Sequence, residues 1–184
     1  NWTASFIIRS FNMSTGELGT WLALTMGLAG AIGVFGGAVL ADKLAVKEKR
    51  WYAWLPTIAG FICVPFIIAS FLADDVYMVL ALTVIPGLLF NVYLGTTIAT
   101  THSLVGARMR ATASAILFLI LNIIGLGLGP SSVGLLSDYY EPSMGVESLR
   151  YAMLSVIPAA VFLSAACFFF AAKTLRQDVA NAPA

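Results

Sequence analysis

Two asparagines and two aromatic residues are the side chains best suited to bind a small molecule. Asn91 and Asn122 each lie near the middle of a long apolar stretch, where an amide needs a hydrogen-bonding partner. Phe118 shares one side of a helix with Asn122, and Tyr93 closely follows Asn91. We predict that these residues contact an amphipathic substrate through ring stacking and hydrogen bonds. The alternative is that the amides bond each other, or a neighbouring backbone, and only join helices.

Enzymatic chemistry has no support in this sequence. There is one histidine, and the uncharged stretches contain no paired Asp, His-x-x-x-His or Gly-x-Ser-x-Gly pattern. Cys63 and Cys167 fall inside apolar stretches and are most simply small packed side chains. We therefore expect no enzyme activity, no metal site, no cofactor and no nucleic-acid partner.

A charged connector follows the first apolar stretch and contains the only acid at its mouth. This connector opens with Gly37, Asp42 and Lys43 and ends at Arg50. A carboxylate at a boundary between lipid and water can accept hydrogen bonds from a helix amino terminus or pair with a cation. Arg110 stands at a comparable boundary, just before another apolar stretch.

The composition of the chain is that of a membrane protein. Hydrophobic residues make up 60% and charged residues 10%, with a mean hydropathy of +0.92, whereas soluble domains are about a quarter charged. About 20 apolar residues cross a bilayer as a helix. Continuous runs without alternation disfavour a β-barrel. We predict an all-α membrane protein with five transmembrane helices at residues 20–41, 52–72, 76–101, 111–136 and 151–172.

The distribution of cations predicts the orientation in the bilayer. Of the ten Lys and Arg residues, only Arg9 and Arg150 fall on one predicted side. The basic side of a membrane protein faces the cytoplasm. We therefore expect a multi-pass protein of the plasma (inner) membrane, with a loosely ordered cytoplasmic tail at residues 173–184 and a cytoplasmic C-terminus. Residues 1–19 are too short and polar to span, and we interpret them as the outer end of a helix whose beginning is absent.

Glycine and proline positions predict how the helices pack. Gly27, Gly30, Gly33 and Gly37 recur at spacings of three and four, which forms one face of the first helix. Such a face allows tight packing or the sliding of a neighbouring helix. The third helix is longer than a bilayer requires, and Pro86-Gly87 is its expected bend.

Three sequence motifs resemble those of the major facilitator superfamily of transporters. Residues 36–43 are similar to the Gly-x-Leu-Ala-Asp-Arg signature between the second and third helices of each half, although Ala38 replaces the second glycine and Lys43 replaces the arginine. Residues 110–115 resemble the Arg-x-x-Ala start of the fifth helix of a half, and residues 129–134 resemble its Gly-Pro-x-x-Gly element.

The resemblance implies a place in the fold and a set of gating residues. The five helices would be the eighth to twelfth of twelve, forming most of the C-terminal six-helix half, and the missing N-terminal half would be the partner. Residues 129–138 and 147–152 look most like the spinster-like branch, which is associated with proton-linked transport of lysolipids and sphingoid lipids. The residues implied in conformational gating are Gly37, Asp42, Lys43, Arg110, Gly129 and Pro130.

The function expected on these grounds is secondary active transport. The solute would be small and organic or amphipathic, lipid-like if the branch holds, and moved by alternating access. The alternative is a non-transporting membrane scaffold or assembly subunit, for which apolar helices would suffice. The five spans contain no Asp, Glu, Lys or Arg. If transport is proton-coupled, the proton site therefore lies in the missing part or at a boundary residue such as Asp42 or Glu17.

The predicted orientation can be tested by cysteine labelling. Glu48→Cys should react with an impermeant maleimide only after the membrane is opened, because it lies in the basic connector. Glu147→Cys should react in intact cells. Reaction of Glu147→Cys only in opened cells would reverse the orientation.

Overall fold

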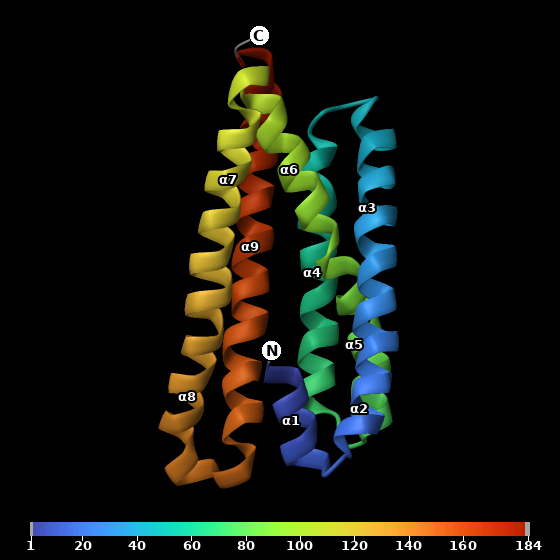
Figure 1. Ribbon diagram of the computed structural model, residues 1–184, viewed down its shortest axis with the longest axis vertical. Coiled ribbons are helices and arrows are strands. Elements are labelled where there is room, and N and C mark those ends of the chain that lie inside the picture. The colour runs from blue at the N-terminus through green and yellow to red at the C-terminus, as the bar shows by residue number, and fades with distance from the viewer. Residues whose placement is uncertain (1, 183–184) are drawn as a thin grey trace.

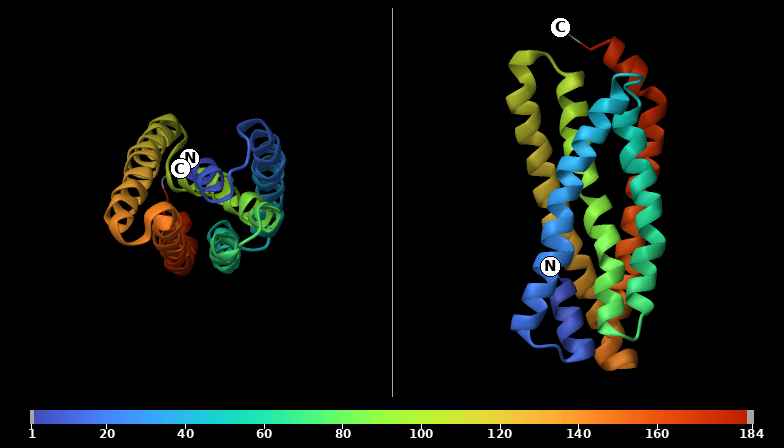
Figure 2. Two further views of the ribbon diagram at one scale, coloured as in Figure 1. Left: turned by 90° about the horizontal axis from the view of Figure 1, so that it is seen from below. Right: turned by 90° about the vertical axis from the view of Figure 1, so that its right-hand side faces the viewer.

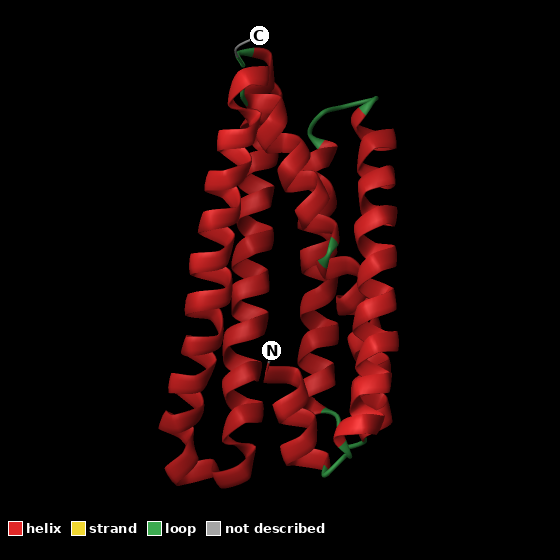
Figure 3. Ribbon diagram, in the orientation of Figure 1, coloured by secondary structure: helices red, strands yellow, loops and turns green. Residues whose placement is uncertain are grey.

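The computed structural model describes residues 2–182, which form helices joined by short turns (Figures 1 and 3). Among the described residues, four stretches of helix are long and apolar enough to cross a membrane. The last of them, Ala107–Ala180, doubles back near its middle (Figure 1). The all-α prediction is confirmed. The elements are α1 (Trp2–Phe11), α2 (Thr15–Leu22), η1 (Ala23–Leu28), α3 (Ala29–Ala45), α4 (Trp51–Leu72), α5 (Val76–Phe90), α6 (Val92–Leu104), η2 (Ala107–Met109), α7 (Arg110–Ile120), η3 (Leu121–Leu128), α8 (Gly129–Met144), η4 (Gly145–Glu147) and α9 (Ser148–Ala180).

The helices extend beyond the uncharged stretches because caps and packing, rather than charges, end them. Ser14 caps α2 by accepting a hydrogen bond from the Glu17 N–H, and Asp75 caps α5 by accepting one from the Met78 N–H. These side chains satisfy amide groups that would otherwise lack a partner at a helix start. The chain is therefore already helical at Thr15, five residues before the predicted start.

The predicted loose tail is wrong for residues 173–180. This segment continues α9, and Leu175 is buried there. Leu175 and Val179 belong to a small apolar cluster with Ala53 and Trp54 at the start of α4. The energy of burying these side chains keeps the last turns of α9 helical.

The first residues form a buried element rather than the plain end of one helix. Asn12 adopts a left-handed conformation with φ of 52°, which reverses the chain between α1 and α2. Phe6 and Ile7 of α1 are fully buried. The Phe6 ring packs edge-on against Phe71 of α4, with centroids 5.4 Å apart. This short helix is therefore part of the core.

The α4 and α9 helices form the centre of the bundle. Two helices lie beside α4 on one side, and one lies beside α9 on the other. The most extensive packing between elements joins α4 to α9. The α2–η1–α3 helix packs on α5 and α6 on one side, and α8 packs on α9 on the other (Figure 2). The connector between α3 and α4, the turn before α7 and the end of α9 all lie at the top end in Figure 1. The basic segments thus share one end of the bundle, as the charge pattern requires.

The glycine face of α3 brings two backbones into contact. A Cβ atom at Gly33 would overlap the Leu88 carbonyl oxygen, and one at Gly37 would lie 2.8 Å from a methyl carbon of Val92. Gly30 lies against the side chain of Asn91. Gly27, which the spacing assigned to the same face, has no neighbour within 4 Å of its Cβ position. The packing face therefore consists of three of the four predicted glycines.

The third crossing helix breaks at Asn91, not at the expected bend Pro86-Gly87. The α-helix runs through Pro86 to Phe90, and the Asn91 N–H then bonds the Leu89 carbonyl instead of continuing the α pattern. The Asn91 side-chain amide donates to the Gly87 carbonyl over 2.9 Å. Asn91 thus provides a competing hydrogen bond that ends α5, whereas α5 continues through Pro86.

The glycine contact predicts a large difference between two neighbouring substitutions. Gly33→Ala should reduce the free energy of unfolding by about 1–3 kcal/mol, because the added methyl group would collide with the Leu88 backbone. Gly36→Ala is the matched control, since its Cβ position is open. Thermal unfolding of the purified protein in detergent measures both. Equal stability of the two variants would contradict the close approach.

Candidate functional site

An apolar cavity of about 460 Å³ lies inside the bundle. Its walls come from α1, α4, the α5–α6 junction, η3, α8 and α9, including Trp2, Gly60, Tyr93 and Met153. The short helix α1 lies in the lower part of the bundle in Figure 1, and its residue Trp2 lines the cavity. The indole N–H of Trp2 donates to the Pro130 carbonyl over 3.0 Å, which joins α1 to α8.

The cavity brings together three of the residues selected from the sequence. Tyr93, Gly129 and Pro130 all line it, and Gly125 joins them one turn before Gly129. The Tyr93 ring packs edge-on against Phe90, with centroids 5.6 Å apart. The side of η3 and α8 that carries the glycines therefore faces the α5–α6 junction.

Phe118 and Asn122 do not line this cavity. Both are exposed, and the Asn122 amide donates to the Phe118 carbonyl of its own helix over 2.7 Å. None of the described residues of α7 or η3 is buried. These two side chains therefore lie on a helix that the remainder of the bundle leaves uncovered.

Asn91 is directed elsewhere, against α3. An added Cβ atom at Gly30 would lie 3.1 Å from the Asn91 side-chain nitrogen, which itself bonds the Gly87 carbonyl. Asn91 and Asn122 thus each bond the backbone of their own helix. The alternative in which the two amides bond each other is wrong. Asn91 lies at a packed position, whereas Asn122 lies at an open one.

Comparison with known proteins adds a family to this geometry. No protein-family model matches the chain. An "MFS-type efflux pump" of Mycolicibacterium smegmatis is 31% identical over 175 residues, which are 95% of this chain and 41% of that protein. A bacterial homologue of the human lysosomal transporter Spinster, solved inward-facing and unoccupied, superposes with a TM-score of 0.84 at 26% identity. The same homologue in its inward-facing, occupied conformation gives a TM-score of 0.80 at 26% identity.

The chain is thus similar in sequence to an MFS-type efflux pump and in fold to a Spinster homologue. All of it is covered by the two solved structures, but it spans only 45% and 46% of those chains. It therefore corresponds to about half of such a transporter, and the spinster-like resemblance in the sequence is supported by the structural match.

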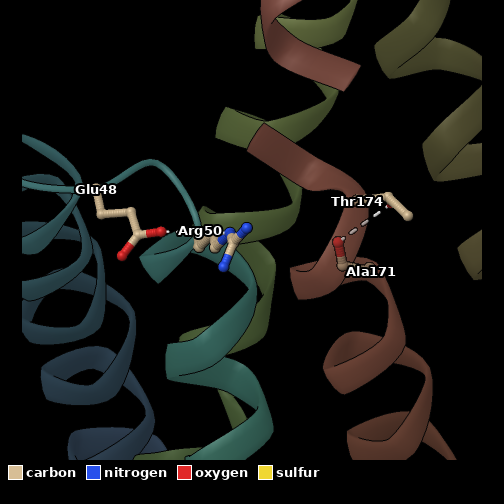
Figure 4. A network of polar contacts seen from close by, with 4 residues as sticks. All are labelled: Glu48, Arg50, Ala171 and Thr174. Carbon is tan, nitrogen blue, oxygen red and sulfur yellow. Dashed lines mark hydrogen bonds and ion pairs between the residues drawn. The ribbon is translucent and has the colours of Figure 1, made fainter. Parts of the chain in front are cut away.

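The gating residues that the sequence resemblance implies at the basic end of the bundle are solvent-exposed. An Asp42 carboxylate oxygen accepts a hydrogen bond from the Tyr52 hydroxyl over 2.9 Å, which ties α3 to the start of α4. Lys43 and Arg110 are exposed at the same end. Within the connector, Arg50 pairs with Glu48 at 3.3 Å (Figure 4). Asp42 therefore contacts a neighbouring helix within its own half.

A histidine joins α6 to α7 at this end. The His102 Nε2 atom lies 2.7 Å from the Ser114 hydroxyl. From the sequence, His102 is expected to be a surface histidine or a local cap at the cytoplasmic edge. The interaction depends on the chain turning back at η2.

Arg150 is a second residue whose role the sequence did not reveal. It entered the sequence argument only as a cation on the outer side. Its guanidinium lies 5.6 Å from the Phe6 ring centroid and 5.7 Å from that of Phe11, and it pairs with Glu147 at 3.0 Å. Its side chain is only 16% exposed. Arg150 thereby attaches α1 to the start of α9.

Two arginine–glutamate pairs provide a matched test of this attachment. Arg150→Met should lower the free energy of unfolding by roughly 2–3 kcal/mol, because it removes ring stacking and leaves the partly buried Glu147 unpaired. Arg50→Met should cost less than about 1 kcal/mol, since both members of that pair are exposed by more than a third. Thermal unfolding in detergent distinguishes them, and a cost at Arg50 equal to that at Arg150 would reject the assignment.

Proposed function

We propose that this chain is the C-terminal half of a secondary active transporter. With an N-terminal half, it would move a small organic or amphipathic solute by alternating access. The observation that carries the proposal is the uncovered α7–η3 helix, whose middle bears the exposed amide of Asn122. Lipid offers an amide no hydrogen-bond partner, so this side of the helix fits a watery path or the other half.

We propose that Phe118 and Asn122 form the solute-contacting face. The Asn122 side-chain nitrogen already serves the Phe118 carbonyl, which leaves its oxygen to accept a hydrogen bond from a polar head group. Tyr93 is a further proposed contact, because it lines the cavity beside Gly125 and Gly129. The surroundings of Asn91 favour a packing role instead.

The helix α1 is too short to cross a bilayer by itself. With 10 residues, α1 is about 15 Å long, whereas a bilayer core is about 30 Å thick. Trp2 of this helix lines the apolar cavity.

The names of the similar proteins support transport. One is described as an efflux pump and the other as a homologue of a lysosomal transporter, solved both occupied and unoccupied. Proton coupling would need a titratable group at the boundary or in the N-terminal half. Glu17, in the first turn of α2, accepts a 3.3 Å hydrogen bond from Tyr77 and is one such group. Asp42 is another.

Reconstitution of the full-length protein separates a transporter from a scaffold. Fluorescent lysolipids and lipophilic dyes, loaded with and without a pH gradient, serve as probes. Protein-dependent movement of any probe, inhibited by unlabelled lysolipid, supports transport. Dependence of that movement on the gradient supports proton coupling. Movement no faster than in empty vesicles, across the whole probe series, would favour the scaffold alternative.

Two asparagine substitutions distinguish the solute face from the packing face. Asn122→Ala should weaken binding of a transported probe about ten-fold or more with unchanged thermal stability, because it removes an exposed hydrogen-bonding group. Asn91→Ala should leave probe affinity unchanged and reduce stability, by about 1 kcal/mol or less, because its amide packs between α3 and α5. Binding and thermal unfolding of the full-length protein measure both effects, and the reverse pattern would reject the assignment.

A further inference from the structure

The chain contains two π-helical segments within membrane-length helices. One is η1 in the helix that continues as α3, and the other is η3, which links α7 to α8 over eight residues. π-helices are rare and usually accommodate one extra residue in an α-helix, often where the helix must change shape. In these two helices, the surroundings of the π segment are very different.

Tertiary contacts hold η1 in place. Thr25 is buried, and its hydroxyl donates to the Trp21 carbonyl over 2.8 Å. Its own carbonyl oxygen would lie 2.9 Å from a Cβ atom at Gly87, so the backbones of η1 and α5 are in close contact. A change of helical register there would disrupt this packing.

No comparable contact holds η3. None of its described residues is buried, and Gly125 has no atom within 4 Å of its Cβ position, apart from the helix's own nearby backbone. Gly125 and Gly127 place no side chain on the helix and have weak preference for the α conformation. The backbone of η3 can therefore change its hydrogen-bond register without displacing a neighbouring element.

Side chains along η3 supply hydrogen bonds that such a change needs. The Asn122 amide donates to the Phe118 carbonyl over 2.7 Å, and the Ser131 hydroxyl donates to the Gly127 carbonyl over 2.8 Å. Pro130 has no N–H, so the Leu126 carbonyl lacks its usual donor in the α register, whereas in the π register the donor is the Ser131 N–H. In lipid, an unpaired carbonyl is costly, and these side-chain donors reduce that cost at both ends of the segment.

The two helices joined by η3 differ in how firmly they are held. Val133 and Ser137 of α8 are buried, and the Pro130 carbonyl is bonded by Trp2. In contrast, α7 has no buried residue among those described, and His102 contacts it through Ser114. A change in η3 would therefore move α7 while α8 stays in place.

We propose that η3 is a conformational switch that interconverts π and α registers and thereby rotates α7 against a fixed α8. Moving one residue between registers turns the helix by about 100°, since an α-helix has 3.6 residues per turn. The Phe118 side chain then faces a different side of the bundle. The rotation involves only α7, η3 and α8, so it can be measured without any transported solute.

Cysteine scanning over residues 116–120 of the full-length protein in nanodiscs tests the switch. Cys63 and Cys167 are first replaced by alanine, and N-ethylmaleimide is the probe. Gly125→Ala with Gly127→Ala favours the α register, and we expect the position of fastest labelling to move by one residue. Deletion of Ile123 removes one residue from the π segment, so the α register forms without rotation, and the fastest position should stay as in the parent protein.

Two results would overturn the proposal. One is an unchanged labelling maximum in the folded double-alanine variant, and the other is a shift of the same size after deletion of Ile123. Should the double-alanine variant fail to fold, Asn122→Leu replaces it, because this change removes the side-chain bond to the Phe118 carbonyl. Asn122→Leu should move the maximum in the same direction, and an unchanged maximum in that variant also overturns the proposal.

Discussion

A bilayer offers a polypeptide no hydrogen-bond partner, and the structure of this chain follows from that constraint. Its buried hydroxyls mostly return to the backbone of their own helix, as Thr57 does to the Ala53 carbonyl and Thr83 to the Leu80 carbonyl. These buried hydroxyls therefore contribute little to joining helices. The helices meet instead through small residues, which allow backbones to approach closely. The contact between Gly33 and the Leu88 carbonyl is the tightest example.

Close packing joins the α4 and α9 helices but leaves the α7–η3 helix out. The α4 and α9 helices contact each other extensively, and Gly60 allows the approach, since its Cβ position lies 2.8 Å from the Ala165 methyl carbon. The α7–η3 helix is left uncovered. This uncovered helix, with the polar group of Asn122 near its middle, is the surface that we propose for a partner half and a solute.

The sequence determined the class of fold. Long stretches without charge predict helices that cross a bilayer, because no other open structure satisfies its backbone there. The sequence was less informative about where helices end. Ser14 extends one helix by capping it, and Leu175 extends another by packing on α4. A cap can in principle be recognised in a sequence. The apolar cluster cannot be recognised in this way, because it joins residues of α4 and α9 that are far apart in the sequence.

The sequence also determined which residues share a helix face, because helical periodicity is local. It placed Phe118, Asn122, Gly125 and Gly129 on one side and the α3 glycines on another. Only the tertiary structure decided what those faces meet. Gly125 and Gly129 line a cavity while Asn122 remains exposed, and Asn91 lies against Gly30. The physical reason is that these contacts join distant parts of the chain, as Trp2 and Pro130 do across 128 positions. Their geometry also depends on the π-helical segment η3 and on the helix break at Asn91. Both change the direction of side chains, and no recognisable sequence pattern predicts them.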